Sequence, residues 1–278
     1  MLDKLQFLDT HTHLNLRQFD DDAEEVLIKM SELSVGAFNV GTCQSTSERA
    51  VALAHSYPEQ LRAIVGLHPL NIFSDPDDPL PPEPELAYEW YLDLARDELV
   101  VGIGECGFDY FHYPDTTYET QRAVFLAQIA LAEEVQKPLM LHLRNGKDSS
   151  GRNAYDDALE ILRAEKTAGR LSVAGNAHFF AGTLAQAEAF IALDFTVSFT
   201  GVITFAAEYA KLIKDLPLDK IHAETDAPYV APKPYRGQRC EPWMVIEVYK
   251  KIAEIKSLPL ETVQETLLAN AQRLYRLD

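Results

Sequence analysis

Eight short apolar runs, spaced almost evenly along the chain, restrict the folds that this sequence can adopt. Each run ends in polar residues, and most are followed by a longer segment with the periodicity of an amphipathic helix. The runs span residues 7–11, 37–42, 62–68, 99–105, 137–143, 170–178, 195–201 and 220–226. From Asp9 in the first run to Asp226 in the last there are seven steps of about 31 residues, which matches one strand with its crossover helix.

Strands that alternate with helices predict a parallel sheet, and eight repeats predict a closed (β/α)8 barrel, the TIM barrel. Several runs are continuously apolar, as expected for strands that are covered on both faces. An open doubly wound sheet is the competing fold, and it usually carries a glycine-rich phosphate turn after its first strand. The sequence at that point is DTHTH, which favours the barrel.

The segments between the runs refine this expectation. Helices are predicted over residues 21–33, 45–57, 118–136 and 183–193, with Ser45 as an N-cap and Glu48 completing a capping box. Two more are predicted after the last strand, over 243–257 and 260–277.

Residues 74–85, rich in proline and acid, predict an irregular surface loop, and residues 144–153 predict a lid-like loop. Without an internal repeat or a long linker, we expect one domain over residues 1–278.

Composition narrows the class of protein. The net charge of −18 and the pI of about 4.8 oppose non-specific adhesion to nucleic acid or to anionic membranes. A nuclease stays possible, because divalent cations in a cleft can invert the local potential. Three cysteines without paired spacing fit a reducing compartment, and neither a signal peptide nor a membrane span is evident. We therefore expect a cytoplasmic protein without membrane contact, and we favour a monomer.

Chemically active side chains gather where the predicted strands end. These are Asp9, His11 and His13 in the first run, His68 in the third, Glu105 in the fourth, His142 in the fifth, His178 in the sixth, and Glu224 and Asp226 in the eighth. The carboxyl ends of the strands form the active-site face of such a barrel. An isolated histidine there is more often a hydrogen-bonded mouth residue than a ligand. Five of the eight histidines at matched positions point instead to a site for two divalent cations, whose chemistry is hydrolysis.

A family resemblance then follows from the motifs. In order along the chain they are DTHTHL (9–14), VGLHPL (65–70), GIGECGFDY (102–110), PLMLHLR (138–144), AHFFAG (177–182), FTG (199–201), AETDAPYVAP (223–232), RGQRCEP (236–242) and NAQRLYRL (270–277). Together they resemble the motifs of the TatD-type metal-dependent deoxyribonucleases. That family belongs to the amidohydrolase superfamily of metal-bearing barrels.

The resemblance implies a role for each motif residue. His11, His13 and Asp226 hold one cation, His142 and His178 hold the second, and Glu105 bridges the two; zinc, magnesium and manganese are the candidate metals. His68 is expected to contact the substrate phosphate, and Arg144, Arg236 and Arg239 are further candidates for that contact. The alternative for each arginine is an ion pair with a nearby acid. Phe179 and Cys240 depart from the residues common in the family, and they leave the substrate preference open.

The resulting hypothesis is a deoxyribonuclease of the 3′–5′ exonuclease type that acts on single-stranded DNA ends. Water oriented by Glu105 and Asp226 attacks the phosphorus, and Asp226 is the candidate general base. Glu224 is expected to play a structural role. One alternative keeps the metals but acts on a small molecule, as an amidohydrolase or a phosphotriesterase-like enzyme. A second alternative is a non-catalytic barrel that acts as an interaction protein.

Overall fold

The computed structural model describes residues 5–74, 80–147 and 151–277, and within them it confirms the predicted (β/α)8 barrel. Eight strands form one sheet in which each strand pairs in parallel with the next along the chain. They are β1 (Phe7–Thr12), β2 (Val35–Val40), β3 (Leu61–Val65), β4 (Val100–Asp109), β5 (Leu139–Arg144), β6 (Gly175–Ala177), β7 (Phe195–Phe199) and β8 (Ile221–Ala223).

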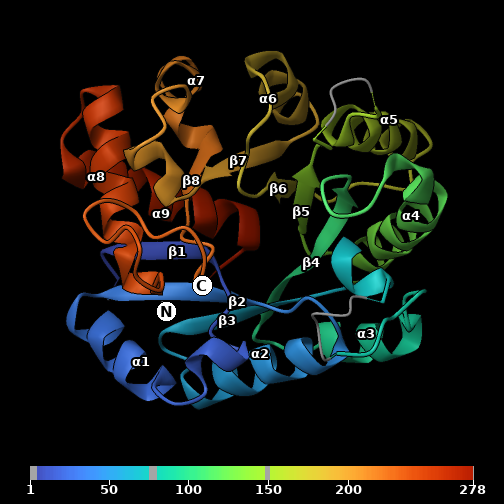
Figure 1. Ribbon diagram of the computed structural model, residues 1–278, viewed down its shortest axis with the longest axis horizontal. Coiled ribbons are helices and arrows are strands. Elements are labelled where there is room, and N and C mark those ends of the chain that lie inside the picture. Colours follow the sequence, from blue (N-terminus) through green and yellow to red (C-terminus); the bar gives the residue numbers. More distant parts are fainter. Residues whose placement is uncertain (1–4, 75–79, 148–150, 278) are drawn as a thin grey trace.

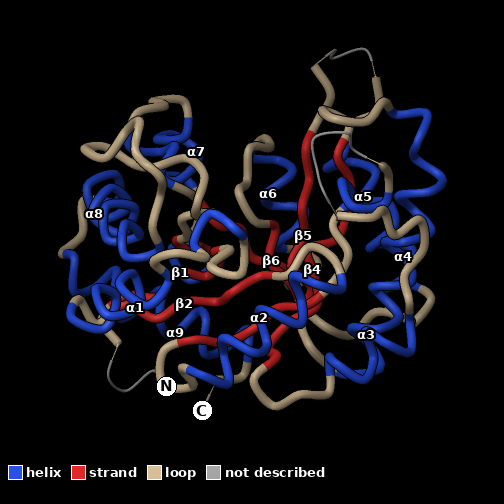
Figure 2. Tube along the Cα trace, turned by 60° about the horizontal axis from the view of Figure 1, so that its bottom comes forward, coloured by secondary structure: helices blue, strands red, loops and turns tan. Residues whose placement is uncertain are grey.

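Helices surround the strands in chain order, so the sheet is covered all round (Figure 1; Figure 2). They are α1 (Ala23–Glu32), α2 (Gln44–Ser56), α3 (Tyr88–Ala95), α4 (Tyr118–Val135), α5 (Ala154–Thr167), α6 (Leu184–Ile191), α7 (Tyr209–Asp215), α8 (Val245–Lys256) and α9 (Leu260–Tyr275). The predicted helices are all present, and their ends differ from the prediction by at most two residues. In the described part of the chain, no helix combines the length and the apolar character that a membrane crossing requires.

The predicted N-cap of α2 is wrong in its residue. The helix begins at Gln44, one residue before Ser45. The hydroxyl of Thr46 accepts hydrogen bonds from the backbone N–H of Thr42 (2.8 Å) and of Cys43 (3.0 Å). The N–H groups before the helix are therefore bound by a residue of its first turn. The two predicted loops are irregular where they are described; residues 75–79 and 148–150 lie outside the described residues.

Backbone and side-chain hydrogen bonds join β1 to the residues that follow β8 and so help to close the barrel. The Asp226 N–H donates to His11 O (2.9 Å), and Thr12 forms an isolated bridge with Ala227. The buried carboxylate of Asp9 accepts from the Thr225 N–H (2.8 Å) and from the Thr225 hydroxyl. Asp9 therefore holds the seam of the barrel together.

The barrel interior is apolar toward the amino ends of the strands. Leu8, Phe38, Ile64 and Met140 form one buried cluster there with residues of α9. The ring of Tyr275 in α9 meets Phe38 edge-on, with ring centres 4.7 Å apart. Helix α9 thus covers the end of the barrel at which the strands begin. The opposite end, where the strands finish, is the open face.

Candidate metal centre

The carboxylate of Glu105 lies between two pairs of histidines. Its Oε1 atom is 3.3 Å from Nε2 of His11 and 3.3 Å from Nε2 of His13. Its Oε2 atom is 2.9 Å from Nε2 of His178 and 3.4 Å from Nδ1 of His142. Asp226 Oδ1 adds a further donor, 3.4 Å from Nε2 of His13. The structure therefore brings all six predicted ligands together, although they come from five strands.

Local irregularities in two strands lie at these ligands. Between Asp9 and Thr12, β1 has one residue more than β2, and His11 lies in this interval. Between Ile103 and Cys106, β4 has one residue more than β5, and Glu105 lies there. An extra residue of this kind bends a strand and re-aims its side chains, and such bulges are frequent beside active sites.

Close approach of β4 to β5 also requires a glycine before Glu105. Gly104 has a φ of 151°, and a Cβ atom added there would lie 2.4 Å from the carbonyl oxygen of Met140. A side chain at this position would push the two strands apart. The glycine thus allows the close strand packing in which Glu105 reaches histidines of other strands.

Hydrogen bonds on the far side of the rings decide which nitrogen faces the centre. Nδ1 of His13 is 2.9 Å from Val40 O, which can only accept, so Nδ1 carries the proton and Nε2 is free. Nε2 of His142 is 3.0 Å from Oδ2 of Asp109, so this nitrogen donates and Nδ1 faces the centre. Both free nitrogens are those that approach Glu105, as metal ligation requires.

Asp109 is a supporting residue that we did not single out from the sequence. Its fully buried carboxylate accepts from His142, from the backbone N–H of Phe111, and from the backbone N–H and the ring Nδ1 of His112. Burial alone would raise the pKa of Asp109, but the hydrogen bond and the charge of His142, with those from His112, lower it below its usual value. Its position four residues after Glu105 on one strand was the available signal, because both then face the same side.

Glu224 plays the corresponding part behind His178. It is fully buried, and its Oε1 atom lies 3.7 Å from Nδ1 of His178. The hydroxyl of Ser198 donates to its Oε2 atom (2.6 Å), and Asn176 donates to Ser198 (2.7 Å). Glu224 thus lies as a buried carboxylate behind a candidate ligand, at ion-pair distance but without a hydrogen bond to it.

His68 also faces the centre, but its hydrogen bonds distinguish it from the ligands. Its Nδ1 atom accepts from the Leu70 N–H (3.0 Å), so in the neutral ring the proton is on Nε2. Nε2 lies 3.7 Å from Oε2 of Glu105. Burial, with repulsion from His142, lowers the pKa of His68 to about 3, which keeps the ring neutral. His68 therefore presents an N–H donor to the mouth of the barrel.

The two carboxylates of the centre are held in the ionised form. Burial alone would raise the pKa of Glu105, but attraction from His11 and His178 outweighs it and holds the pKa well below its usual value. Burial likewise opposes ionisation of Asp226, and its interactions with His13 and His11 lower its pKa. Asp226 has a φ of 59°, in the left-handed region, which is uncommon outside glycine and frequent at functional sites.

These donors fit a divalent cation. A tetrahedral site with ligand bonds of ~2.0–2.1 Å places neighbouring donor atoms about 3.3 Å apart. Nε2 of His11 and Nε2 of His13 are 3.2 Å apart, and Nδ1 of His142 is 3.3 Å from Nε2 of His178. Three overlapping groups each bring their possible ligand atoms within 4.8 Å of one another, close enough to hold a metal ion; they are His11, His13 and Glu105; His11, His178 and Asp226; and His68, Glu105 and His142. Imidazole nitrogen with carboxylate oxygen is a ligand set that suits zinc or manganese.

Two of the three predicted phosphate-binding arginines are exposed on the open side of the barrel. Arg144 ends β5, and its guanidinium lies 3.9 Å from the ring centre of Phe111. Arg236 follows β8, and its guanidinium lies 3.7 Å from the ring centre of Phe205. Neither forms an ion pair with a carboxylate among the described residues, so both charges are available to an anion.

Arg239 is engaged differently. Its two terminal nitrogens donate to the two carboxylate oxygens of Asp22, at 2.8 and 2.6 Å. It also donates to Gln18 O (2.6 Å) and approaches Glu241 at 3.3 Å. The structure thus places Arg239 in the ion pair that was the alternative to phosphate binding.

Fold and site together define a metal-dependent hydrolase built on a TIM barrel. The chain belongs to the family described as TatD related DNase, whose sequence model it matches over residues 8–276. Among curated proteins it is 34% identical over 273 residues to YabD of Bacillus subtilis, an uncharacterised metal-dependent hydrolase, covering 97% of this chain and 99% of that one.

Two further relatives extend the comparison. The chain is 29% identical over 284 residues to the 3′-5′ ssDNA/RNA exonuclease TatD of Pectobacterium parmentieri, covering 97% of this chain and 99% of the relative. The crystal structure of YjjV, a TatD homologue from Escherichia coli, superposes with a TM-score of 0.83 at 29% identity and covers 100% of both chains. The family resemblance drawn from the motifs is thereby confirmed.

Proposed function

We propose that the protein is a deoxyribonuclease that trims single-stranded DNA from its 3′ end by hydrolysing phosphodiester bonds with two divalent cations. The observation that carries this proposal is the carboxylate of Glu105, which turns one oxygen to His11 and His13 and the other to His142 and His178. A carboxylate whose two oxygens face two different groups of candidate ligands is the arrangement expected when one carboxylate bridges a pair of metal ions.

The ligand assignment is the one that the family resemblance implies, and several donor distances support it. His11, His13 and Asp226 would hold one cation, and His142 with His178 would hold the other. Glu105 would contribute to both. Zinc, magnesium or manganese would lower the pKa of a water molecule and stabilise negative charge on the phosphoryl oxygens.

The chain's own residues then position the substrate and move the proton. Asp226, ionised and partly open to the mouth, accepts the proton of the attacking water. His68 donates its Nε2–H to a non-bridging phosphate oxygen. Arg144 and Arg236 contact neighbouring phosphates from the loops after β5 and β8, because guanidinium groups bind phosphate oxygens through paired N–H donors.

An aromatic side chain at the mouth supports a nucleic acid substrate over a small apolar one. Tyr229 is 48% exposed, and its ring centre lies 6.5 Å from that of His13. A base at the end of a single strand can stack on such a ring, and stacking accepts any base. The relative from Pectobacterium parmentieri, named as an ssDNA/RNA exonuclease, agrees with this choice.

The test uses a 5′-labelled single-stranded oligonucleotide with each metal supplied in turn. We expect stepwise shortening from the 3′ end, loss of that activity in the Asp226→Asn variant, and loss on removal of metal by a chelator. Asp93→Asn makes the same chemical change at a side chain that is 81% exposed, and it should leave the rate unchanged. Circular dichroism of each variant checks that the fold is intact.

Three results would count against the proposal. Cleavage of circular single-stranded DNA as fast as the linear form excludes end trimming. Faster turnover of an amide, lactone or phosphotriester than of DNA favours the small-molecule hydrolase. Purified protein that binds no metal by elemental analysis, even after metal is supplied, favours the non-catalytic barrel.

A further inference from the structure

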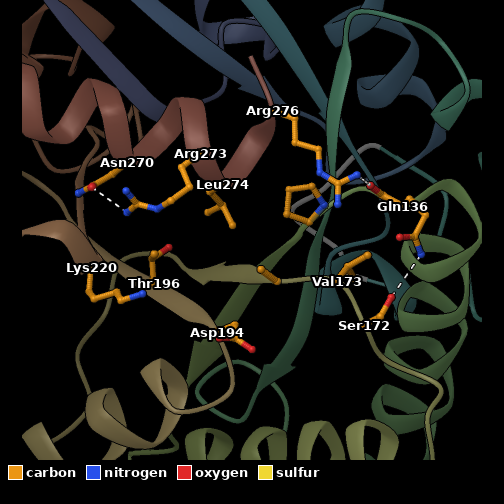
Figure 3. A pocket seen from close by; sticks show the side chains of 12 residues that line it. Gln136, Ser172, Val173, Asp194, Thr196, Lys220, Asn270, Arg273, Leu274 and Arg276 are labelled. Atoms are coloured by element: carbon orange, nitrogen blue, oxygen red, sulfur yellow. Dashed lines mark hydrogen bonds between the residues drawn. The ribbon is translucent and has the colours of Figure 1, made fainter. Parts of the chain in front are cut away.

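A basic cavity lies at the end of the barrel opposite the candidate metal centre. It has a volume of about 280 Å³. Its walls come from the segments that enter β5, β6, β7 and β8 and from the last turns of α9 (Figure 3). The metal-centre residues lie at the carboxyl ends of strands, whereas these segments lie at the amino ends. We propose that this cavity binds a small molecule that carries a phosphate group.

Charge is the first reason. Lys220, Arg273 and Arg276 line the cavity, in a chain whose net charge is −18. The only acid in the lining is Asp194, and its carboxylate is already paired with Lys166 at 2.5 Å. Three cations that share a cavity without a counterion repel one another, and a bound anion removes this repulsion.

The three cations are also free of carboxylate partners. Arg273 donates to two neutral acceptors, Asp219 O (2.7 Å) and Asn270 Oδ1 (2.9 Å). Arg276 donates to another neutral acceptor, Gln136 O (3.3 Å). Among the residues that the structure describes, none of the three forms an ion pair. By contrast, several arginines elsewhere, such as Arg170, are neutralised by acids.

The cavity holds one of these cations in place. Asn270 is buried, with only 1% exposed, and its Nδ2 atom donates to the carbonyls of Leu218 and Ile221, both at 2.9 Å. Its Oδ1 atom is thereby directed to Arg273. One terminal nitrogen of Arg273 is thus fixed, and its remaining N–H groups are left for a ligand. A donor fixed in advance loses less conformational entropy on binding.

Shape selects the class of ligand. Figure 3 shows Lys220 and Arg276 on opposite sides of the cavity, with Pro138, Val173 and Leu274 among the apolar residues of its wall. Cavities for small ligands measure about 300–1,000 Å³. At about 280 Å³ this one lies just below that range, so it fits only a small metabolite and excludes a polymer. A phosphate group has enough oxygens to meet guanidinium and ammonium donors together, and the apolar wall accepts a short carbon body.

Basic residues in the last turn of a helix also have a simpler explanation, because they complement the negative end of the helix dipole. That explanation covers Arg273 and Arg276 in α9 and at its end. It does not cover Lys220, which precedes β8 and reaches the same cavity from another element. The cavity is therefore more than the end of one helix.

The test is calorimetric titration of the metal-loaded full chain with inorganic phosphate, glucose 6-phosphate and succinate. In the Lys220→Gln/Arg276→Gln variant, the affinity of the cavity for phosphate should be at least about tenfold weaker, because two charge-assisted contacts are removed. Its DNA cleavage should stay unchanged. The control, Arg96→Gln/Lys250→Gln, removes the same charge from exposed surface pairs and should retain binding.

Phosphate can also bind at the metal centre, so the titrations are repeated on His142→Ala, which leaves the cavity intact. If His142→Ala still binds one phosphate, the proposal is supported. It is supported further if that remaining phosphate binding disappears in the double variant His142→Ala/Lys220→Glu. Wild-type affinity in the Lys220→Gln/Arg276→Gln variant would overturn it, as would complete loss of binding in His142→Ala alone. Succinate that binds as tightly as phosphate would overturn the assignment to phosphate.

Discussion

A buried histidine should make the stability of this protein fall steeply in mild acid. His222, in β8, is fully buried inside the barrel, and its ring centre lies 6.2 Å from that of Tyr275. Neither ring nitrogen has a hydrogen-bond partner among the described residues. Burial, with repulsion from Arg273, lowers the pKa of His222 from 6.5 to about 3. The folded protein therefore holds this ring neutral.

The sign and size of the effect follow from linkage. Because the folded pKa lies below the unfolded value, the unfolded chain binds the proton first as the pH falls. The free energy of unfolding then decreases by about 1.4 kcal/mol for each pH unit below 6.5, and the decrease ends near pH 3. At about pH 5 the loss reaches about 2 kcal/mol, whereas above about pH 7.5 it is close to zero.

Urea unfolding of wild type and His222→Met at about pH 7.5 and about pH 5 measures this difference, because methionine has a similar volume and no proton to bind. A chelator in every sample prevents metal release from contributing. Wild type should lose about 2 kcal/mol more than the variant between the two pH values. Tyr275→Phe is the control, since it alters the neighbouring residue and keeps His222. Equal losses in wild type and His222→Met would refute the reasoning.

Three further predictions concern single contacts. Glu224→Gln should weaken metal affinity about 10- to 100-fold, measured by chelator competition, because His178 loses the carboxylate behind it. Tyr249→Phe should lower the free energy of unfolding in urea by about 1–3 kcal/mol, because the buried N–H and C=O of Leu8 both lose their hydroxyl partner. Arg239→Gln should cost less than about 1 kcal/mol and leave the KM for DNA unchanged, since its guanidinium is held in a part-exposed ion pair.

The barrel was predictable because its signal is long and repeated. Eight apolar runs at a regular spacing leave few folds, and the ligands follow once strand ends are known to share one face. His11 and His13 illustrate this, because side chains two positions apart in a strand face the same way. The structure places their Nε2 atoms 3.2 Å apart. The helix starts were less predictable. Ser45 and Thr46 both have capping hydroxyls, and only the turn geometry decides between them.

The supporting residues could not be assigned from the sequence. Asp9 lies within β1 and Glu224 directly follows β8, on the same strands as candidate ligands, yet Asp9 ties β1 to Thr225 and Glu224 lies behind His178. The difference depends on a one-residue register shift in β1 and on the Ser198 hydroxyl of a neighbouring strand. Neither contact leaves a periodic pattern in the sequence, because both join residues that are far apart along the chain.

The centre is supported unequally on its two sides, and this inequality bears on how Asp226 can work. His142 and His178 each have a buried carboxylate behind the ring: Asp109 fixes His142 by a hydrogen bond, and Glu224 lies 3.7 Å from Nδ1 of His178. His13 has only the carbonyl oxygen of Val40 behind it. The less supported side is the one that includes Asp226, whose side chain is 14% exposed, compared with 3% for Glu105. A ligand that must also accept a proton needs room to move and access to water, so the geometry favours Asp226 over Glu105 as the base.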